Sequence, residues 1–163
     1  MMASGQKNLY YTRQLISRQL ICNDKVNQLR HARYLGSAEN LVAHMAAHAD
    51  LLRPKFEAVL EVLEQELSPV GIGKWTAPKG GYFISLDLPK GTAERTCTLA
   101  KEAGIVLTPA GATFPYGKDP MDSNLRIAPS FPTIEEITKA TGVLCLCAKI
   151  ACCEIRQNGD SNE

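Results

Sequence analysis

The sequence predicts an α+β fold: a small, mainly antiparallel sheet with helices packed on one face, preceded by a long helical segment. Two observations carry this prediction. Apolar residues recur at helical steps of three to five from about residue 6 to residue 67. After "SPVGIG" (68–73) the pattern changes, and strand-like and helix-like runs follow in the order β-β-α-β-β-α. A chain of 163 residues is long enough for one domain with its own core.

Three helices are expected before the sheet. The first covers 6–21. Asn23-Asp24 interrupts it and can cap a second helix over 24–35, which Gly36 ends. The third runs from Ser37 to about residue 67. Pro54 lies inside it and should kink the helix or split it near 51–53. One apolar face of this third helix is expected to pack inward: Leu52, Phe56, Val59, Leu60, Leu63 and Leu67.

The first strands are expected at 74–78 and 81–89, with the "KGG" turn between them. Thr92 or Gly91 opens the helix that follows, which ends at Gly104. The apolar run "IVLTP" (105–109) then predicts a third strand.

A turn-rich stretch, "AGATFPYGKDPMDSN", separates this run from a fourth predicted strand at 125–128. Loops of this length in compact domains are usually functional or disordered. A closing helix is predicted after it, capped by Thr133 with Glu135 and Glu136 in its first turn.

Composition excludes several classes of function. The formal net charge is +1, which argues against a nucleic-acid surface. No apolar run approaches the roughly 20 residues that span a bilayer. The N-terminus lacks the basic start and apolar middle of a signal peptide, so a cytoplasmic protein is expected.

The cysteines and histidines do not form a recognisable metal pattern. The spacing of Cys145, Cys147, Cys152 and Cys153 does not match a zinc site, and a buried helix that uses cysteine as a small hydrophobe is favoured. The separate Cys22 and Cys97 suggest only a reducing compartment. His44 and His48 are four apart and could form half a zinc site, but no third ligand is placed by sequence. A polar helix face is favoured there, and no metal is expected.

Arg126 is the candidate binding residue. It lies in an otherwise apolar run, "LRIAP" (125–129), directly after the long loop. Apolar neighbours would hold its stem and dry its surroundings, and such an arginine suggests a bound anion. The alternative is a side chain that points outward from a half-exposed edge strand.

Three segments in order, "PKGGYFISLDLP", "AGIVLTPAGATFPYG" and "NLRIAPSFP", resemble the small, C-terminal domain of fold-type-I pyridoxal-phosphate aminotransferases of class I/II. The segments "DKVNQLRHARYL", "HADLLRPKFEAVLEVLE" and "LTPAGATFPYGKDP" look most like the MocR-type group, which includes bacterial aspartate aminotransferases. The resemblance extends from residue 1 to about residue 156.

The resemblance implies a role for Arg126, whose counterpart in the family binds the substrate α-carboxylate. It also implies pyridoxal phosphate as cofactor, an amino acid and a 2-oxo acid as substrates, and a homodimer. Further pocket residues are expected to be Gly81, Tyr82, Gly111 and Tyr116. Gly81 and Gly111 also fit turns that need a positive φ, whatever the protein does. Tyr82, Phe83 and Phe114 are favoured as core or pocket wall rather than reactive groups.

The chain departs from the family in one respect. The family's cofactor lysine, its aspartate and its phosphate pocket belong to the large domain, and no lysine of this sequence lies in the expected context. We therefore expect a fragment: 1–36 a helical lead-in from a missing large domain, 37–156 the small-domain unit, and 157–163 a disordered tail. No catalytic residue is expected in this chain, and the isolated chain should be inactive.

Two other readings stay open at this point. MocR-like proteins join an aminotransferase-like domain to a DNA-binding module, so the chain could be the effector or oligomerisation domain of a transcriptional regulator, without catalysis. It could also be an independent interaction domain in which residues 6–67 form an oligomerisation surface.

Overall fold

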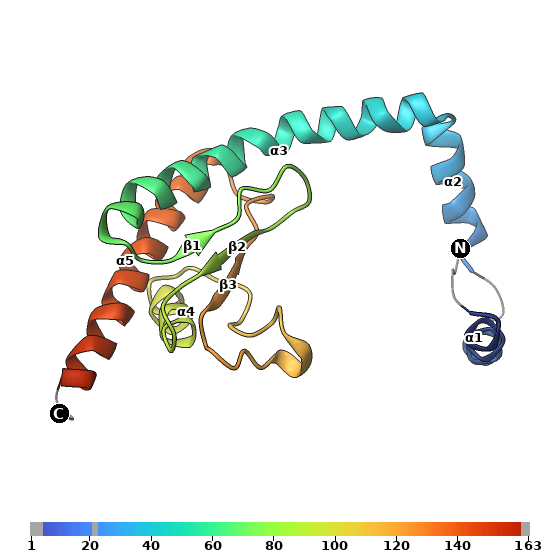
Figure 1. Ribbon diagram of the computed structural model, residues 1–163. Helices are drawn as coiled ribbons and strands as arrows, with labels where there is room; N and C mark the ends of the chain where they lie inside the picture. The colour runs from blue at the N-terminus through green and yellow to red at the C-terminus, as the bar shows by residue number, and fades with distance from the viewer. Residues whose placement is uncertain (1–4, 21–22, 161–163) are drawn as a thin grey trace. The chain divides into compact units, whose positions relative to one another are not determined.

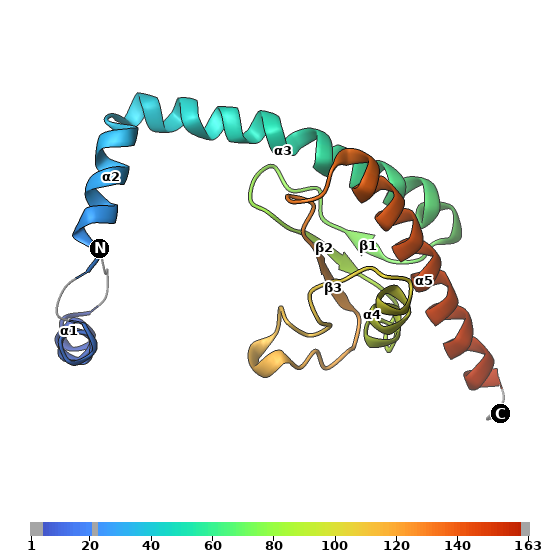
Figure 2. The same ribbon diagram turned by 180° about the vertical axis from the view of Figure 1, so that it is seen from behind.

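The computed structural model describes residues 5–20 and 23–160 (Figures 1 and 2). It divides into two compact units, Met1–Ala46 and Ala47–Glu163. None of the helices in the described ranges is both long enough and apolar enough to cross a membrane. The element order is α1 (Gln6–Gln19), α2 (Lys25–Leu35), α3 (Ala38–Glu66), β1 (Lys74–Trp75), β2 (Ile84–Asp87), α4 (Ala93–Glu102), β3 (Asn124–Ile127) and α5 (Ile134–Asp160), with short 3-10 turns at Ser68–Val70 and Pro115–Gly117.

The first unit is helical, as predicted, and its helix ends follow the local sequence. The Asp24 carboxylate caps α2 by accepting a hydrogen bond of 2.9 Å from the Asn27 backbone N–H. Gly36, with φ of 65°, ends the same helix. Neither α1 nor α2 contains a buried residue, so these helices have no core of their own among the described residues.

Helix α3 runs without interruption through Pro54, so the predicted split near 51–53 is wrong. Proline removes one intrahelical hydrogen bond and costs about 3 kcal/mol in a helix interior. The residues that follow it, Phe56, Val59 and Leu63, are buried in the core. Each such burial contributes about 1.5–3 kcal/mol. Packing therefore outweighs the local cost of the proline.

The second unit contains a three-stranded antiparallel sheet in the order β1-β2-β3. Along β2 and β3, Ile84 pairs with Ile127 and Leu86 pairs with Leu125, and all four side chains are buried. Because successive strand residues face opposite sides, these pairs form one apolar face.

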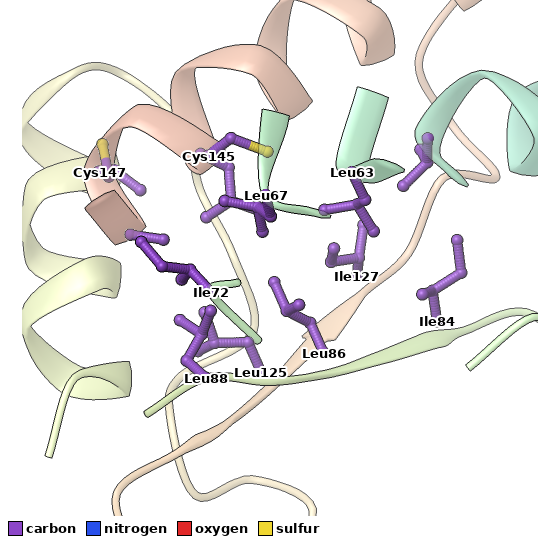
Figure 3. Close-up of a cluster of buried hydrophobic side chains, with 14 of the residues drawn as sticks. Leu63, Leu67, Ile72, Ile84, Leu86, Leu88, Leu125, Ile127, Cys145 and Cys147 are labelled. Atoms are coloured by element: carbon purple, nitrogen blue, oxygen red, sulfur yellow. The ribbon is translucent and has the colours of Figure 1, made fainter. Parts of the chain in front are cut away.

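Helices cover that apolar face, which confirms the predicted α+β class. Figure 3 shows side chains of the sheet meeting side chains of α3 and α5. Helix α4 packs on α5 and adds Ala93 and Ala100 to the same cluster. The labelled members of this core are Leu63, Leu67, Ile72, Ile84, Leu86, Leu88, Leu125, Ile127, Cys145 and Cys147.

Residues 105–109 do not form the predicted strand. They are non-helical and belong to no ladder of the described sheet, and the side chain of Val106 is 90% exposed. An apolar run can become a strand only where a sheet edge is close enough to pair with it. Here the run and the end of β3 instead line a common cavity of about 450 Å³.

Helix α5 begins as predicted. The Glu136 carboxylate accepts hydrogen bonds from the Thr133 backbone N–H and hydroxyl at 2.8 and 2.9 Å, and the Thr133 hydroxyl accepts one from the Glu136 N–H at 3.2 Å. This is a capping box. The helix extends to Asp160, so residues 157–160 continue it rather than forming a disordered tail. Residues 161–163 lie outside the described residues.

Candidate anion-binding site

Arg126 lies in the middle of β3, on the face of the sheet opposite the core. Its two neighbours, Leu125 and Ile127, are only 2% and 3% exposed and point into the core. The expectation that these apolar neighbours surround the arginine is therefore wrong, because successive strand side chains point to opposite faces of the sheet. The environment of the guanidinium is set by residues across the strand instead.

Phe83 supplies that environment. The Arg126 guanidinium carbon lies 4.4 Å from the centroid of the Phe83 ring, a cation–π arrangement. Phe83 directly precedes β2, and the register places Ser85 opposite Arg126. Phe83 is thus a diagonal neighbour of the arginine on the same face. The expectation that Phe83 is a wall residue rather than a reactive group agrees with this placement.

The hydrogen-bonding capacity of Arg126 is unused. Its Nε–H is buried and has no hydrogen-bond partner in the part of the chain that the structure describes. Within residues 5–20 and 23–160, Arg126 also takes part in no ion pair. An unpaired buried donor on a cation is costly and is usually explained by a missing partner. The arrangement can therefore accept an anion.

The cavity beside Arg126 is mainly apolar. Its lining includes Leu107, Phe131 and Leu144, and one carboxylate, that of Glu136. Glu136 does not pair with the arginine because the carboxylate is bound to Thr133 at the start of α5. The hydrogen bond from the Thr133 N–H is the main reason that the pKa of Glu136 lies below its usual value. At neutral pH the cavity is therefore lined by the Glu136 carboxylate, which is already hydrogen-bonded to Thr133, and by the Arg126 guanidinium, which has no anionic partner among the described residues.

A polar network lies next to Arg126 on the same face of the sheet. The Asn124 amide donates to Ser85 Oγ at 2.8 Å and to Asp87 Oδ1 at 2.6 Å. Its oxygen accepts a hydrogen bond of 2.7 Å from the Thr113 hydroxyl. Sequence reasoning missed this network. It could have been found from the alternation of side chains along a strand. That alternation puts Ser85 and Asp87 on one face of β2, and Asn124 and Arg126 on one face of β3.

The long loop is ordered by its own hydrogen bonds. The Asp119 carboxylate accepts from the backbone N–H groups of Met121, Ser123 and Asn124. These bonds, led by that from Ser123, hold the pKa of Asp119 below its usual value. Tyr116 adopts a φ of 60° and its side chain is 98% exposed. The loop thus has a defined path that returns to the start of β3.

The four further predicted pocket residues are not brought together around Arg126. Gly81 and Gly111 have φ of 87° and 80°, which confirms that both occupy turns needing a positive φ. Gly111 lines a separate cavity of about 790 Å³, between α4 and the long loop. Tyr82 and Tyr116 are exposed. A role of any of the four in a substrate pocket stays a prediction.

The cysteines of α5 behave mainly as small apolar residues, as predicted. Cys145, Cys147 and Cys152 are buried, whereas Cys153 is exposed. Burial raises the pKa of the Cys145 thiol to about 11, so this thiol stays protonated and unreactive at neutral pH. Cys22 lies outside the described residues.

Solved aminotransferase structures share this helix-covered antiparallel sheet. The chain superimposes on a crystal structure of an aspartate transaminase from Corynebacterium glutamicum with a TM-score of 0.84 and 46% identity, over 93% of this chain and 36% of that one. The α-aminoadipate aminotransferase of Thermus thermophilus, with a TM-score of 0.72 and 23% identity over 93% of this chain and 38% of that one, shares the fold.

The sequence defines the family. Residues 1–160 match the aspartate aminotransferase family, and the chain belongs to it. The aspartate aminotransferase of Corynebacterium glutamicum is 52% identical over 131 residues, which are 80% of this chain and 30% of that protein. The chain thus spans about a third of the length of the relatives it matches. The predicted resemblance to the C-terminal domain of fold-type-I aminotransferases is confirmed.

Proposed function

We propose that this chain is the small domain of a pyridoxal-phosphate-dependent enzyme that transfers an amino group between an amino acid and a 2-oxo acid. In the intact enzyme Arg126 binds the α-carboxylate of the substrate. The observation that carries this assignment is the unpaired guanidinium with a buried, unpartnered Nε on the open face of the sheet. Family membership supports the reaction class.

The chemistry of Arg126 suits a carboxylate. A guanidinium presents parallel N–H groups that match the two oxygens of a carboxylate, which fixes orientation as well as adding binding free energy. Contact with the Phe83 ring restricts the plane of the guanidinium. Orientation matters because the Cα–H bond of the substrate must be aligned for its cleavage.

The described residues fit the substrate rather than the cofactor. Among the described residues the Nε–H of Arg126 has no partner, and a substrate carboxylate could supply one. We assign no residue of this chain to pyridoxal phosphate. Lys55, from α3, is committed elsewhere: its ammonium donates to the Ser130 and Phe131 carbonyl oxygens at 2.8 and 3.3 Å. When bound, pyridoxal phosphate supplies the electron sink for the reaction. We expect its lysine and its other contacts in a different part of the full-length enzyme.

The substrate to test first is L-aspartate, with a 2-oxo acid as acceptor, because the relative at 52% identity is named an aspartate aminotransferase. We also propose that the intact enzyme is a homodimer, as the resemblance implies.

The assignment is tested by Arg126→Lys in the full-length enzyme. Lysine keeps the charge but loses the forked geometry, and a charge-assisted hydrogen bond contributes about 1.5–3 kcal/mol. We expect kcat/KM for L-aspartate to fall by about 10- to 100-fold, since 1.4 kcal/mol corresponds to tenfold.

Arg53→Lys is the matched control. Arg53 is exposed and makes only a 3.8 Å pair with Asp50, so kcat/KM should not change. If Arg126→Lys behaves like Arg53→Lys, the proposed role of Arg126 is wrong.

A further inference from the structure

Asn124 is a buried polar residue that no part of the proposed reaction uses. It is only 8% exposed, and all the donors of its side chain are occupied. The shorter of its two donated hydrogen bonds, 2.6 Å, goes to the carboxylate of Asp87. A hydrogen bond to a charged acceptor is roughly twice as strong as one between neutral groups. The amide therefore fixes where the Asp87 carboxylate points.

The position of the Asp87 carboxylate matters for Arg126 because the strand register brings the two residues close together. Asp87 pairs with Asn124, and Ser85 pairs with Arg126, on neighbouring antiparallel strands. Asp87 and Arg126 are therefore diagonal neighbours on the same face of the sheet. Diagonal neighbours lie about 7–8 Å apart between Cα atoms, within reach of a long side chain. Phe83 is the diagonal neighbour on the other side of Ser85, so a free Asp87 carboxylate could form an ion pair with Arg126 if the guanidinium turned from the Phe83 ring toward Asp87.

The structure shows that this ion pair is not made. Asp87 accepts its hydrogen bond from Asn124, and Arg126 is left without an anionic partner among the described residues. Lys74, opposite Asp87 on β1, is the other cation placed on this side by the register, and the described ion pairs do not include a Lys74–Asp87 pair.

We propose that Asn124 is a positioning residue that holds the Asp87 carboxylate away from Arg126 and so keeps the arginine available for the substrate carboxylate. This inference rests on the proposed role of Arg126. An amide suits the task because it donates to a carboxylate without adding charge. An aspartate at 124 would place a second anion beside the arginine, and an alanine would release Asp87.

The test is a suppressor experiment in the full-length enzyme. In Asn124→Ala, Asp87 should pair with Arg126 and compete with the substrate. An exposed ion pair is worth about 0.2–1 kcal/mol, so KM for L-aspartate should rise by about 1.4- to fivefold with kcat little changed. Adding Asp87→Ala removes the competitor and should return KM to the wild-type value. Asp87→Ala alone should leave KM unchanged.

Ser85→Ala is the matched control, because it removes the other acceptor of the Asn124 amide but leaves Asp87 held. Its KM should equal that of the wild type. If the Asn124→Ala protein does not fold, Asn124→Ser replaces it, since the shorter hydroxyl cannot reach Asp87. A KM that stays raised in the double variant, or that rises equally in Ser85→Ala, would show that Asn124 acts only through local structure and would overturn the proposal.

A crystal structure of the Asn124→Ala enzyme separates this inference from the proposed function. An Asp87–Arg126 ion pair would show that Asn124 holds Asp87 away from Arg126 even if Arg126→Lys leaves the kinetics unchanged, a result that would refute the substrate assignment and with it the benefit to substrate binding. If Asp87 turns to Lys74 or to solvent and Arg126 stays unpaired, the positioning role is refuted even if Arg126→Lys behaves as expected.

Discussion

At Gly111 the backbone of the long loop lies close to the backbone of Gly117, further along the same loop. A Cβ atom at this position would lie 2.5 Å from the carbonyl oxygen of Gly117, closer than real side chains come to backbone atoms, and the φ is +80°. Both constraints require glycine here. A side chain at this position would therefore force the loop that leads into β3 to shift.

Gly111→Ala should destabilise the second unit. A non-glycine residue in this backbone region costs about 1–3 kcal/mol, and the contact with Gly117 adds to that cost. Gly81→Ala is the matched control, because Gly81 has a similar φ of +87° but open space around it. We expect the free energy of unfolding, measured by denaturant titration, to fall more in Gly111→Ala than in Gly81→Ala. Equal losses would mean that the close approach to Gly117 is not a constraint.

Some residues of the candidate site could be predicted from the sequence and others could not. Arg126 could be found because a charged residue in an apolar run is unusual and the resemblance gave it a role. Phe83 and Asn124 were missed as partners because each looks ordinary in sequence, one aromatic and one polar residue at a strand end. Their importance comes from the pairing of β2 with β3, which joins residues about 40 positions apart.

At the scale of elements, the start of α5 makes the stability of the chain depend on pH. The pKa of Glu136 is lowered in the folded chain, first by the hydrogen bond from the Thr133 N–H. A lowered pKa means that the carboxylate stabilises the folded state fully above its unfolded pKa, near 4.5, and loses this effect as the pH falls through the folded value.

Glu136→Gln should therefore lower the free energy of unfolding at pH 7, and the difference from the wild type should shrink as the pH falls below 4.5. Denaturant titrations at both pH values measure this. Glu135→Gln is the control, since Glu135 lies in the same turn but pairs with Lys139 rather than capping the helix. A difference for Glu136→Gln that does not depend on pH would contradict the capping role.

Helices were predicted more accurately than strands because their ends depend on local chemistry. Asp24, Gly36 and Thr133 mark helix ends in the sequence and in the structure. A strand depends also on a distant partner. The apolar run at 105–109 has strand-forming residues but no paired edge, and β1 is limited to Lys74–Trp75 although the sequence allowed residues up to 78. Beyond β1, Thr76 still bonds to Ser85.

At the scale of the whole molecule, the two units differ in what stabilises them. The buried apolar cluster belongs to the second unit, whereas α1 and α2 bury no residue. Apolar side chains on these helices are exposed, among them Tyr10, Tyr11, Val26, Leu29 and Tyr34. Amphipathic spacing correctly predicted helices there, but spacing alone cannot say which surface an apolar face will contact.

The isolated chain should have no transaminase activity, because we assign no cofactor lysine within it. Added pyridoxal phosphate should give no absorbance band that depends on one particular lysine. A spectrophotometric titration of the chain measures this, with the full-length enzyme as the positive control. A band that disappears on substitution of a single lysine of this chain would show that the cofactor site is here.

The alternation of β3 has a consequence for how the protein tolerates change. Within four consecutive residues, Leu125 and Ile127 belong to the core while Asn124 and Arg126 belong to the open face. We expect substitutions at the first pair to reduce the amount of folded protein, and substitutions at the second pair to act on the proposed anion-binding site instead. One short strand therefore serves the core and the candidate site with alternate residues, and a deletion of one residue within it would move the following side chains to the opposite face.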